Sequence, residues 1–412
     1  MNGLQLENPY LRLFIKYSLP VFAISIISRT FPIISFIYFI VPILLITYIL
    51  LAILIVPWNG KRLSSLVILF TYPLYCILTS LWSLQPVISI QRSLYQLVLY
   101  AGILSAVYLY NKIFPEKAIS FLVPANVIIV LISFLSLIFN FPEDAWSGGN
   151  GLGFMGFAGH QNTLAAGILF TLPGLLVYKI KNKGTKIIVI RIFYFLLLTF
   201  NLLLILLTYS RASILALAIG IITYLILTKS KKILAILFSL IAILIVLSLF
   251  APPLKNSIDS VLNKDGGNLL DRRKVLWEPS LQAAKLGGLI GLGYGVSAPN
   301  IKSPILTGSH FEDGRYIREK GNSTLAVIEE TGWIGLFLFL LPVFWVIRKF
   351  IIYNAQFTIK EKLKNNYAFY IIYCALLVML IHSQFEAWWV GPGSVQLPLY
   401  LIVLFTSILN DN

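Results

Sequence analysis

Apolar residues run along this chain in long, nearly uncharged stretches, unlike the alternating pattern of strands or the one-sided pattern of soluble helices. The stretch 188–208 is an example, because it is long enough to cross a bilayer and its one charged residue, Arg191, stands near its start. Such stretches predict about twelve membrane-spanning helices. The predicted spans are 11–28, 31–57, 64–82, 91–110, 119–139, 163–178, 188–208, 213–228, 233–251, 323–347, 366–384 and 396–410.

The composition agrees with a chain that lies mostly in a bilayer. Of its 412 residues, 58% are hydrophobic and 12% are charged, whereas a soluble domain typically carries about 25% charged residues. We therefore predict an all-α polytopic membrane protein, with the first span kept as an anchor because no cleavable signal peptide is evident. Both cysteines, Cys76 and Cys374, fall inside predicted spans, which argues against a disulfide framework or a cysteine metal site.

The net charge of +16 would suggest nucleic acid binding in a soluble protein, but its distribution indicates a role in topology. Basic residues are concentrated in alternate connections, and the other short connections hold little positive charge beyond Arg29, Arg92 and Arg211. The basic connections carry Lys61, Arg62, Lys112, Lys117, Lys179, Lys181, Lys183, Lys186, Lys229, Lys231, Lys232, Arg348, Lys349, Lys360, Lys362 and Lys364. The positive-inside rule places these connections and both termini in the cytoplasm.

One hydrophilic connection, from about Ala251 to Gly321, is much longer than the others and falls on the outer side. It divides the chain into spans one to nine (1–250), a large periplasmic loop (251–322) and spans ten to twelve (323–412). Loops beyond roughly 15 residues are usually functional or disordered. This loop mixes ten Lys or Arg with seven Asp or Glu. We favour an ordered lid over a site, with a flexible connector as the alternative.

Within this loop, Asp271–Lys285 predicts a helix on which Trp277, Leu281 and Ala284 share a face. Pro279 predicts a kink or a later start. The glycine-rich stretch 287–295 that follows predicts a flexible turn. It is not a nucleotide-binding loop, because no strand–turn–helix context or Gly-Lys-Ser/Thr accompanies it.

Histidines and arginines gather on the predicted outer side. All three histidines, His160, His310 and His382, fall on the outer side or at an outer span end. Arginines at that surface suit a lipid-linked diphosphate, since the guanidinium fork binds phosphate oxygens. The candidates are Arg29, Arg92, Arg211, Arg272 and Arg273. An interfacial anchor is the simpler reading for each alone, except Arg211, whose very short turn favours a functional role.

Four segments together resemble the O-antigen polymerase/ligase superfamily of bacterial envelope proteins. They are Gly159–Ala165, Tyr209–Ser213, the run from Arg273 through Trp277 to Gly291-Leu292-Gly293, and Asn322–Leu325 with Glu330–Leu336. Their order, the span count and the large loop before the tenth span strengthen the resemblance, which covers roughly residues 80–390.

The resemblance implies a bacterial inner-membrane glycosyltransferase with its active face in the periplasm, similar to the all-helical GT-C-like class, and needing neither metal nor cofactor. Such enzymes move a glycan from undecaprenyl diphosphate to a glycan acceptor, and chain-length regulators or assembly proteins are candidate partners. It assigns the diphosphate to Arg211 and Arg273, with Arg272 and Arg92 beside them. It makes Asn322 the Asn of a His-Asn pair.

Polymerase is favoured over ligase because Gly321 stands where ligases carry the His of that pair. The alternative is that His310, in the same loop, replaces this base. A transporter or flippase of lipid-linked glycans is the second alternative. It would be expected to carry charges at mid-membrane and two related halves. The sequence shows no internal repeat and, apart from the first span with Arg12 and Lys16, no charge near a span centre. A non-enzymatic scaffold would not need the clustered outer Arg, His and Glu.

The expected reaction is displacement at the anomeric carbon, for which an acceptor hydroxyl must lose a proton. The candidate bases are His310, Glu312, Asp313, Glu319 and His160, and Glu330 is a further catalytic candidate. For Glu329 and Glu330, a structural ion pair at a helix start is favoured over catalysis, and Glu330 or Glu386 could position arginines. The glycan would be bound by His160, Asn162, Trp277 and Asn322. Trp388 and Trp389 suit sugar stacking or, more simply, an interfacial aromatic belt.

Overall fold

The computed structural model describes residues 8–56, 60–115, 117–146, 153–177, 186–236, 239, 269–299, 301, 320–356, 367–391 and 393–409. In these ranges the regular structure is helical. The α-helices are α2 (Pro9–Ser28), α3 (Ile40–Ile55), α4 (Gly60–Leu78), α5 (Pro86–Ile113), α6 (Val123–Phe139), α7 (Gln161–Val177), α8 (Lys186–Leu207), α9 (Arg211–Leu227), α12 (Leu269–Gly287), α13 (Ser323–Gln356), α15 (Tyr367–His382) and α16 (Gln396–Leu409). Short 3₁₀ helices cover η1 (Pro32–Phe39), η2 (Thr79–Leu81) and η3 (Ser120–Leu122).

The apolar stretches of the sequence became helices, because a helix satisfies its own backbone hydrogen bonds where no water is present. By length and composition, five helical segments could cross a membrane: Pro9–Ser28, Pro32–Ile55, Pro86–Ile113, Ser120–Phe139 and Ser323–Ala355. Shorter apolar helices cover Val67–Leu81, Gln161–Val177, Ile192–Leu207, Arg211–Leu227, Ala368–His382 and Gln396–Leu409. Each of these segments coincides with a predicted span. The prediction of a helical, polytopic membrane protein is confirmed, while the span 233–251 lies largely outside the described residues.

Helix α3 illustrates how these helices divide their surface between protein and surroundings. Its residues Ile43, Ile46, Leu50 and Ile53 are each more than half exposed and follow one another at helical spacing. The opposite face, with Leu45 and Tyr48, is fully buried. A stripe of isoleucine and leucine left uncovered would be unfavourable in water, so it suits a helix that faces lipid.

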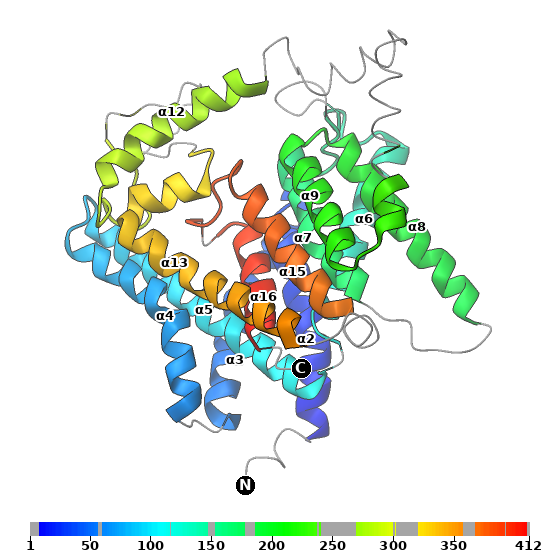
Figure 1. Cartoon of the computed structure of the whole chain (residues 1–412), viewed down its shortest axis with the longest axis horizontal. Coiled ribbons are helices and arrows are strands. Elements are labelled where there is room, and N and C mark those ends of the chain that lie inside the picture. Colours follow the sequence, from blue (N-terminus) through cyan, green and yellow to red (C-terminus); the bar gives the residue numbers. More distant parts are fainter. Residues whose placement is uncertain are drawn as a thin grey trace.

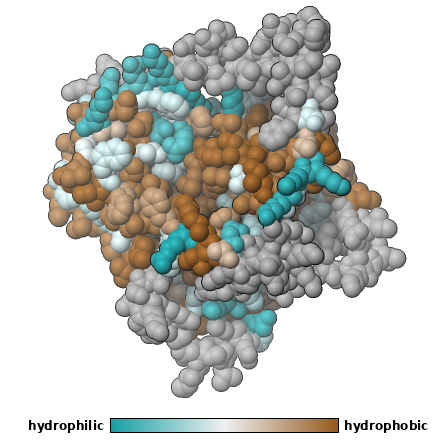
Figure 2. Space-filling model, viewed as in Figure 1, coloured by the Kyte–Doolittle hydropathy of each residue, from teal (hydrophilic) through white to brown (hydrophobic). Residues whose placement is uncertain are grey.

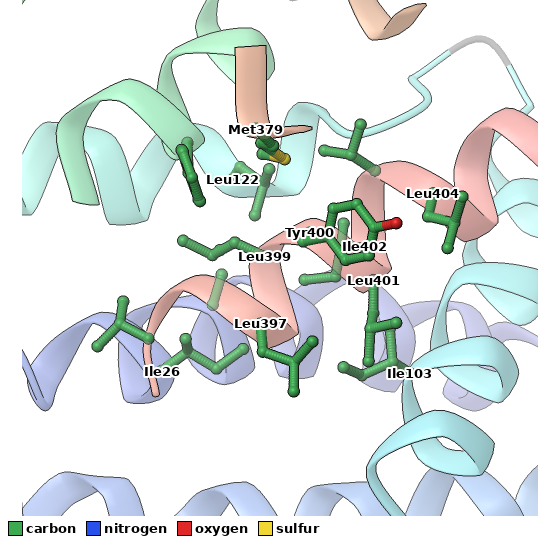
Figure 3. Packing of buried hydrophobic residues seen from close by; sticks show 14 of the residues in the cluster. Ile26, Ile103, Leu122, Met379, Leu397, Leu399, Tyr400, Leu401, Ile402 and Leu404 are labelled. Atoms are coloured by element: carbon green, nitrogen blue, oxygen red, sulfur yellow. The ribbon is translucent and has the colours of Figure 1, made fainter. Parts of the chain in front are cut away.

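Helix α16 occupies the centre of the bundle. Every residue from Leu397 to Ile408 is buried, and the helix packs against α5, α7, α13 and α15. Figure 3 shows side chains of α16, among them Leu399, Tyr400 and Leu401, surrounded by residues of other helices such as Ile103 and Met379. A helix that is apolar on all sides is stable only when it is enclosed on all sides.

Polar side chains also join helices inside the bundle. Asn126 of α6 and Asn201 of α8 exchange two amide hydrogen bonds, at 2.8 and 3.1 Å, and Asn126 also donates to the Thr171 hydroxyl of α7 at 3.0 Å. All three side chains are completely buried. In a membrane such contacts stabilise helix association, because a buried amide without a partner is costly.

Helix α12 lies along one edge of the bundle, at the top of Figure 1, and packs on α13. Figure 2 shows hydrophilic residues gathered along this edge, while apolar residues cover much of the middle of the face. The helix begins at Leu269, so Pro279 does not force the late start that we predicted. The predicted face needs correction too: Ala283 and Ala284 are buried, whereas Leu281 is 48% exposed.

The glycine-rich stretch forms turns, as the sequence predicted, and its backbone hydrogen-bonds to the groups left unpaired by a break in α13. Gly332 has φ +70° and interrupts the helix. Trp333 and Ile334 therefore donate to the carbonyls of Gly288 and Leu289, at 3.2 and 3.1 Å. In turn, the carbonyl groups left without an intrahelical partner are taken by this stretch: Leu292 N donates to Glu329 O and Gly293 N to Glu330 O, both at 3.0 Å.

Candidate functional site

The connection after α15, Ser383–Gly391, is the meeting point of polar side chains from three other segments. From α12, Arg273 donates through Nη1 to the Phe385 carbonyl at 2.6 Å and lies over the Phe385 ring. From the start of α13, Asn322 Nδ2 donates to Gln384 O at 2.9 Å. From the start of α7, Asn162 Nδ2 donates to Glu386 Oε1 at 2.7 Å. We call this set of contacts the 383–391 cluster.

Local structure fixes the residues of this cluster that come from α12 and α13. Asn322 caps α13, because its Oδ1 accepts from Leu325 N at 2.9 Å. Trp277 Nε1 donates to Gly321 O at 3.3 Å, and its ring lies 6.1 Å from that of Phe385. Ser323 Oγ donates to Glu386 O at 2.7 Å and thereby holds the connection against α13.

His160 and Asn162 approach the cluster from the other side. Asn162 N donates to His160 Nδ1 at 3.1 Å, while the Asn162 side chain holds the Glu386 carboxylate. His160 is exposed, and Asn162 and Glu386 are half-buried. The three side chains thus form a linked array at the surface of the bundle, in which a polar ligand could reach both His160 and Glu386.

Arg92 and Glu330 belong to a neighbouring group around Gly295. Arg92 Nη1 donates to Gly295 O at 2.8 Å, and Gly295 N donates to Glu330 Oε2 at 2.6 Å. Next to it, the Tyr294 hydroxyl donates to Gln96 Oε1 at 3.1 Å. Burial raises the pKa of the Tyr294 phenol far above its ordinary value, so this group remains a neutral donor.

A buried ion cluster underlies this group. Lys320 Nζ lies 2.5 Å from Glu330 Oε1 and 3.4 Å from Glu329 Oε2, and all three side chains are less than a tenth exposed. Glu329 Oε1 also accepts from Ala298 N at 2.7 Å. The two carboxylates therefore tie both Lys320 and the backbone of residues 295–298 to α13. The sequence predicted an ion pair here but did not identify its lysine. Two adjacent glutamates in an apolar helix are a signal for a nearby cation, because a buried carboxylate without one is costly.

The remaining predicted residues are placed less fully. Arg211 is half-buried and opens α9, directly after the turn at 208–210. Phe154 N bonds to Leu207 O at 2.8 Å, which holds this turn against the segment leading to α7. His310 and Glu312 lie outside the described residues, as do Asp313 and Glu319. For Arg272 the structure describes the backbone alone.

The expectation for Trp388 and Trp389 was wrong, and these tryptophans lie in the core beside His382. Trp388 and Trp389 are 3% and 2% exposed, and the Trp389 ring lies 4.6 Å from that of Phe339. They are core residues, because the connection after α15 folds back into the bundle, and they form neither an aromatic belt nor a sugar platform. His382 is likewise completely buried, and its Nδ1 accepts from Trp388 Nε1 at 3.3 Å.

Residues 193–340, about a third of the chain, match the model of the O-antigen ligase family. This match supports the resemblance to the O-antigen polymerase/ligase superfamily. No curated protein gives a match.

The matched region runs from α8 into α13. It includes Arg211, Arg273 and Asn322, together with the buried ion cluster. The match supports a glycosyltransferase-like enzyme with a polymerase- or ligase-type role in O-antigen biosynthesis. Among the described residues, no group of three or more His, Cys, Asp or Glu could hold a metal ion.

Proposed function

We propose that this protein polymerises oligosaccharide repeat units carried on undecaprenyl diphosphate, at the periplasmic face of the inner membrane. The donor glycan moves to an acceptor glycan, and undecaprenyl diphosphate is released without the help of a metal. The observation that carries the proposal is the 383–391 cluster. There, an arginine, two asparagines and a carboxylate from four segments are held together at the hydrophilic edge of an apolar bundle.

Arg273 suits the leaving diphosphate. One of its N–H groups is bonded to the Phe385 carbonyl, and a guanidinium has five such donors. The bonded donor and the Phe385 ring fix the plane of the side chain, so its orientation is set before the substrate arrives. Preorganised positive charge of this kind lowers the barrier as charge develops on the leaving group. Arg211, at the start of α9, is the second cation that we assign to the diphosphate.

Polymerisation is favoured over ligation by the backbone at Gly321, where ligases carry a histidine. Gly321 has φ +59°, and a Cβ there would lie 3.0 Å from Leu276 Cβ. A histidine would therefore be strained and crowded at this position. The glycine fits a chain that does not use the base expected of a ligase.

The test is analysis of surface glycan in a deletion strain that carries the wild-type gene or a variant. Arg273→Ala should abolish long polymer and leave single repeat units, because the diphosphate loses a cation in the transition state. Arg211→Ala should do the same. Lys274→Ala is the matched control, since Lys274 is the next residue of α12 and is exposed, and it should restore wild-type glycan.

Other outcomes separate the alternatives. Full-length polymer left on undecaprenyl diphosphate, with bare lipid A-core, would indicate a ligase and overturn the polymerase assignment. Normal glycan from both arginine variants at normal protein levels would refute the diphosphate-binding assignment. Repeat units trapped on the cytoplasmic side of the membrane in the deletion strain would indicate a transporter or flippase.

A further inference from the structure

We propose that the Glu386 carboxylate is the general base that takes the proton from the acceptor hydroxyl. This inference rests on the proposed glycosyl transfer and adds the group that activates its nucleophile. Glu386 is half-buried and belongs to the 383–391 cluster. Its position relative to Arg273 and its support from α7 and α13 carry the argument.

Glu386 directly follows the residue that anchors Arg273. The Phe385 carbonyl accepts from the Arg273 guanidinium at 2.6 Å, so the carboxylate and the cation are attached to neighbouring residues. The anomeric carbon of the donor is bonded to the diphosphate, and the acceptor oxygen must approach that carbon. A base for this reaction therefore belongs near the cation that holds the diphosphate, and Glu386 is next in the chain to the residue that anchors Arg273.

Glu386 is held both at its side chain and at its backbone. Asn162 Nδ2 donates to Oε1 at 2.7 Å, and Ser323 Oγ donates to the Glu386 carbonyl at 2.7 Å. The first contact sets the orientation of the carboxylate, and the second fixes the backbone that carries it. A base oriented by a second polar group is the usual arrangement in enzymes that activate a hydroxyl nucleophile.

In the proposed step, the acceptor O–H bond breaks and its proton moves to a Glu386 carboxylate oxygen. The acceptor oxygen forms a bond to the anomeric carbon. The bond between that carbon and the diphosphate oxygen breaks, and undecaprenyl diphosphate leaves with the electron pair. Arg273 and Arg211 stabilise the negative charge that develops there.

The neighbouring titratable side chains are less suited to this role. Glu329 and Glu330 are buried and bonded to Lys320. His382 is completely buried, and its Nδ1 accepts from Trp388. The Nδ1 atom of His160 accepts from Asn162 N, which places the proton of the neutral ring on Nε2 and makes that atom a donor.

The experiment uses the purified full-length protein and lipid-linked repeat units extracted from the polymerase-deletion strain. Glu386→Gln keeps the shape of the side chain and an oxygen for Asn162, but it cannot accept the proton. Donor affinity should stay at the wild-type value, while the transfer rate at saturating donor should fall by about 10²- to 10⁴-fold. Glu386→Asp should recover part of the rate. Glu278→Gln is the control, because Glu278 is an exposed acid on α12, and it should transfer at the wild-type rate.

The possible outcomes distinguish the two proposals. If Glu386→Gln retains transfer while Arg273→Ala loses it, the base assignment is wrong and glycosyl transfer stands. Loss of donor binding in a Glu386→Gln protein that keeps its wild-type thermal stability would also refute the assignment, since it would make Glu386 a binding group. If the wild-type protein itself binds the donor without transferring it, both proposals fail.

Discussion

Three charged side chains, Lys320, Glu329 and Glu330, are buried together at the start of α13. Removing a charge from water costs several kcal/mol, so a cluster of this kind persists only where the charges compensate one another. Here the second carboxylate is offset by backbone N–H groups as well as by the lysine, since Gly295 and Ala298 each donate to one glutamate. The cluster fastens Lys320, and with it the following residues Gly321 and Asn322, to the helix that carries both acids.

Lys320→Met should destabilise the folded protein by about 3–5 kcal/mol, because it leaves two buried carboxylates without their cation. Thermal unfolding in detergent measures the effect, with the exposed Lys274→Met as the control. Combining Lys320→Met with Glu329→Gln and Glu330→Gln should restore much of the lost stability. A triple variant as unstable as the single one would mean that the lysine acts by packing and not by charge.

At the level of elements, the break in α13 at Gly332 and the turn after α12 are joined by backbone hydrogen bonds. The backbone groups that the break leaves unpaired are the ones that residues 288–293 satisfy. This needs close approach: a Cβ on Gly332 would lie 2.1 Å from Leu289 O, and one on Gly291 would lie 2.3 Å from Glu330 O. These two segments resemble superfamily motifs that contain glycine. Their close contact explains why glycine is needed at these positions.

Gly332→Ala should cost more than about 3 kcal/mol, from overlap with Leu289 and from strain at positive φ together. Gly288→Ala provides the matched control. It also has positive φ, +55°, but a Cβ there meets nothing within 4 Å. It should cost only about 1 kcal/mol, through backbone strain alone. Equal losses of thermal stability in the two variants would show that crowding at Gly332 is unimportant.

The sequence sufficed for features that depend on local pattern. Apolar stretches predicted the helices, and the helix around Trp277 was found in a hydrophilic loop. Contacts between distant segments could not be predicted in this way. The sequence around Lys320 does not identify its partners. Trp388 and Trp389 resemble interfacial residues in the sequence, and only the structure shows that the chain turns back into the bundle and buries them. Likewise, Asn162 and Asn322 were selected as polar candidates, but their shared attachment to residues 384–386 is visible only in three dimensions.

At the level of the whole molecule, two features define the two sides of the bundle. One is the hydrophilic edge that α12 forms, and the other is the set of basic connections. Lys349, in the second half of α13, donates to Ile408 O near the end of α16 at 2.9 Å. The end of α16 thus lies beside the second half of α13, which precedes a basic connection in the sequence. The proposed topology places this side in the cytoplasm and α12 in the periplasm.

Cysteine labelling in intact cells tests this topology. Cysteine at Lys274 should react with a membrane-impermeant maleimide from outside, whereas cysteine at Arg348 should react only after the inner membrane is permeabilised. The background is favourable, because Cys76 and Cys374 are both buried. Labelling in the reverse order would invert the topology and remove the periplasmic site with it.

The enclosed position of α16 also has a consequence for how the protein is made. Translation proceeds from the N-terminus, so α16 leaves the ribosome after the other described helices, including its neighbours α5, α7, α13 and α15. Those neighbouring helices must already be in the membrane when α16 arrives. They cannot yet pack against one another in the final arrangement, because the position of α16 between them is still empty. Assembly thus passes through a bundle with an open groove that lipid or the insertion machinery must occupy. Entry of α16 into this groove closes the bundle of the described helices.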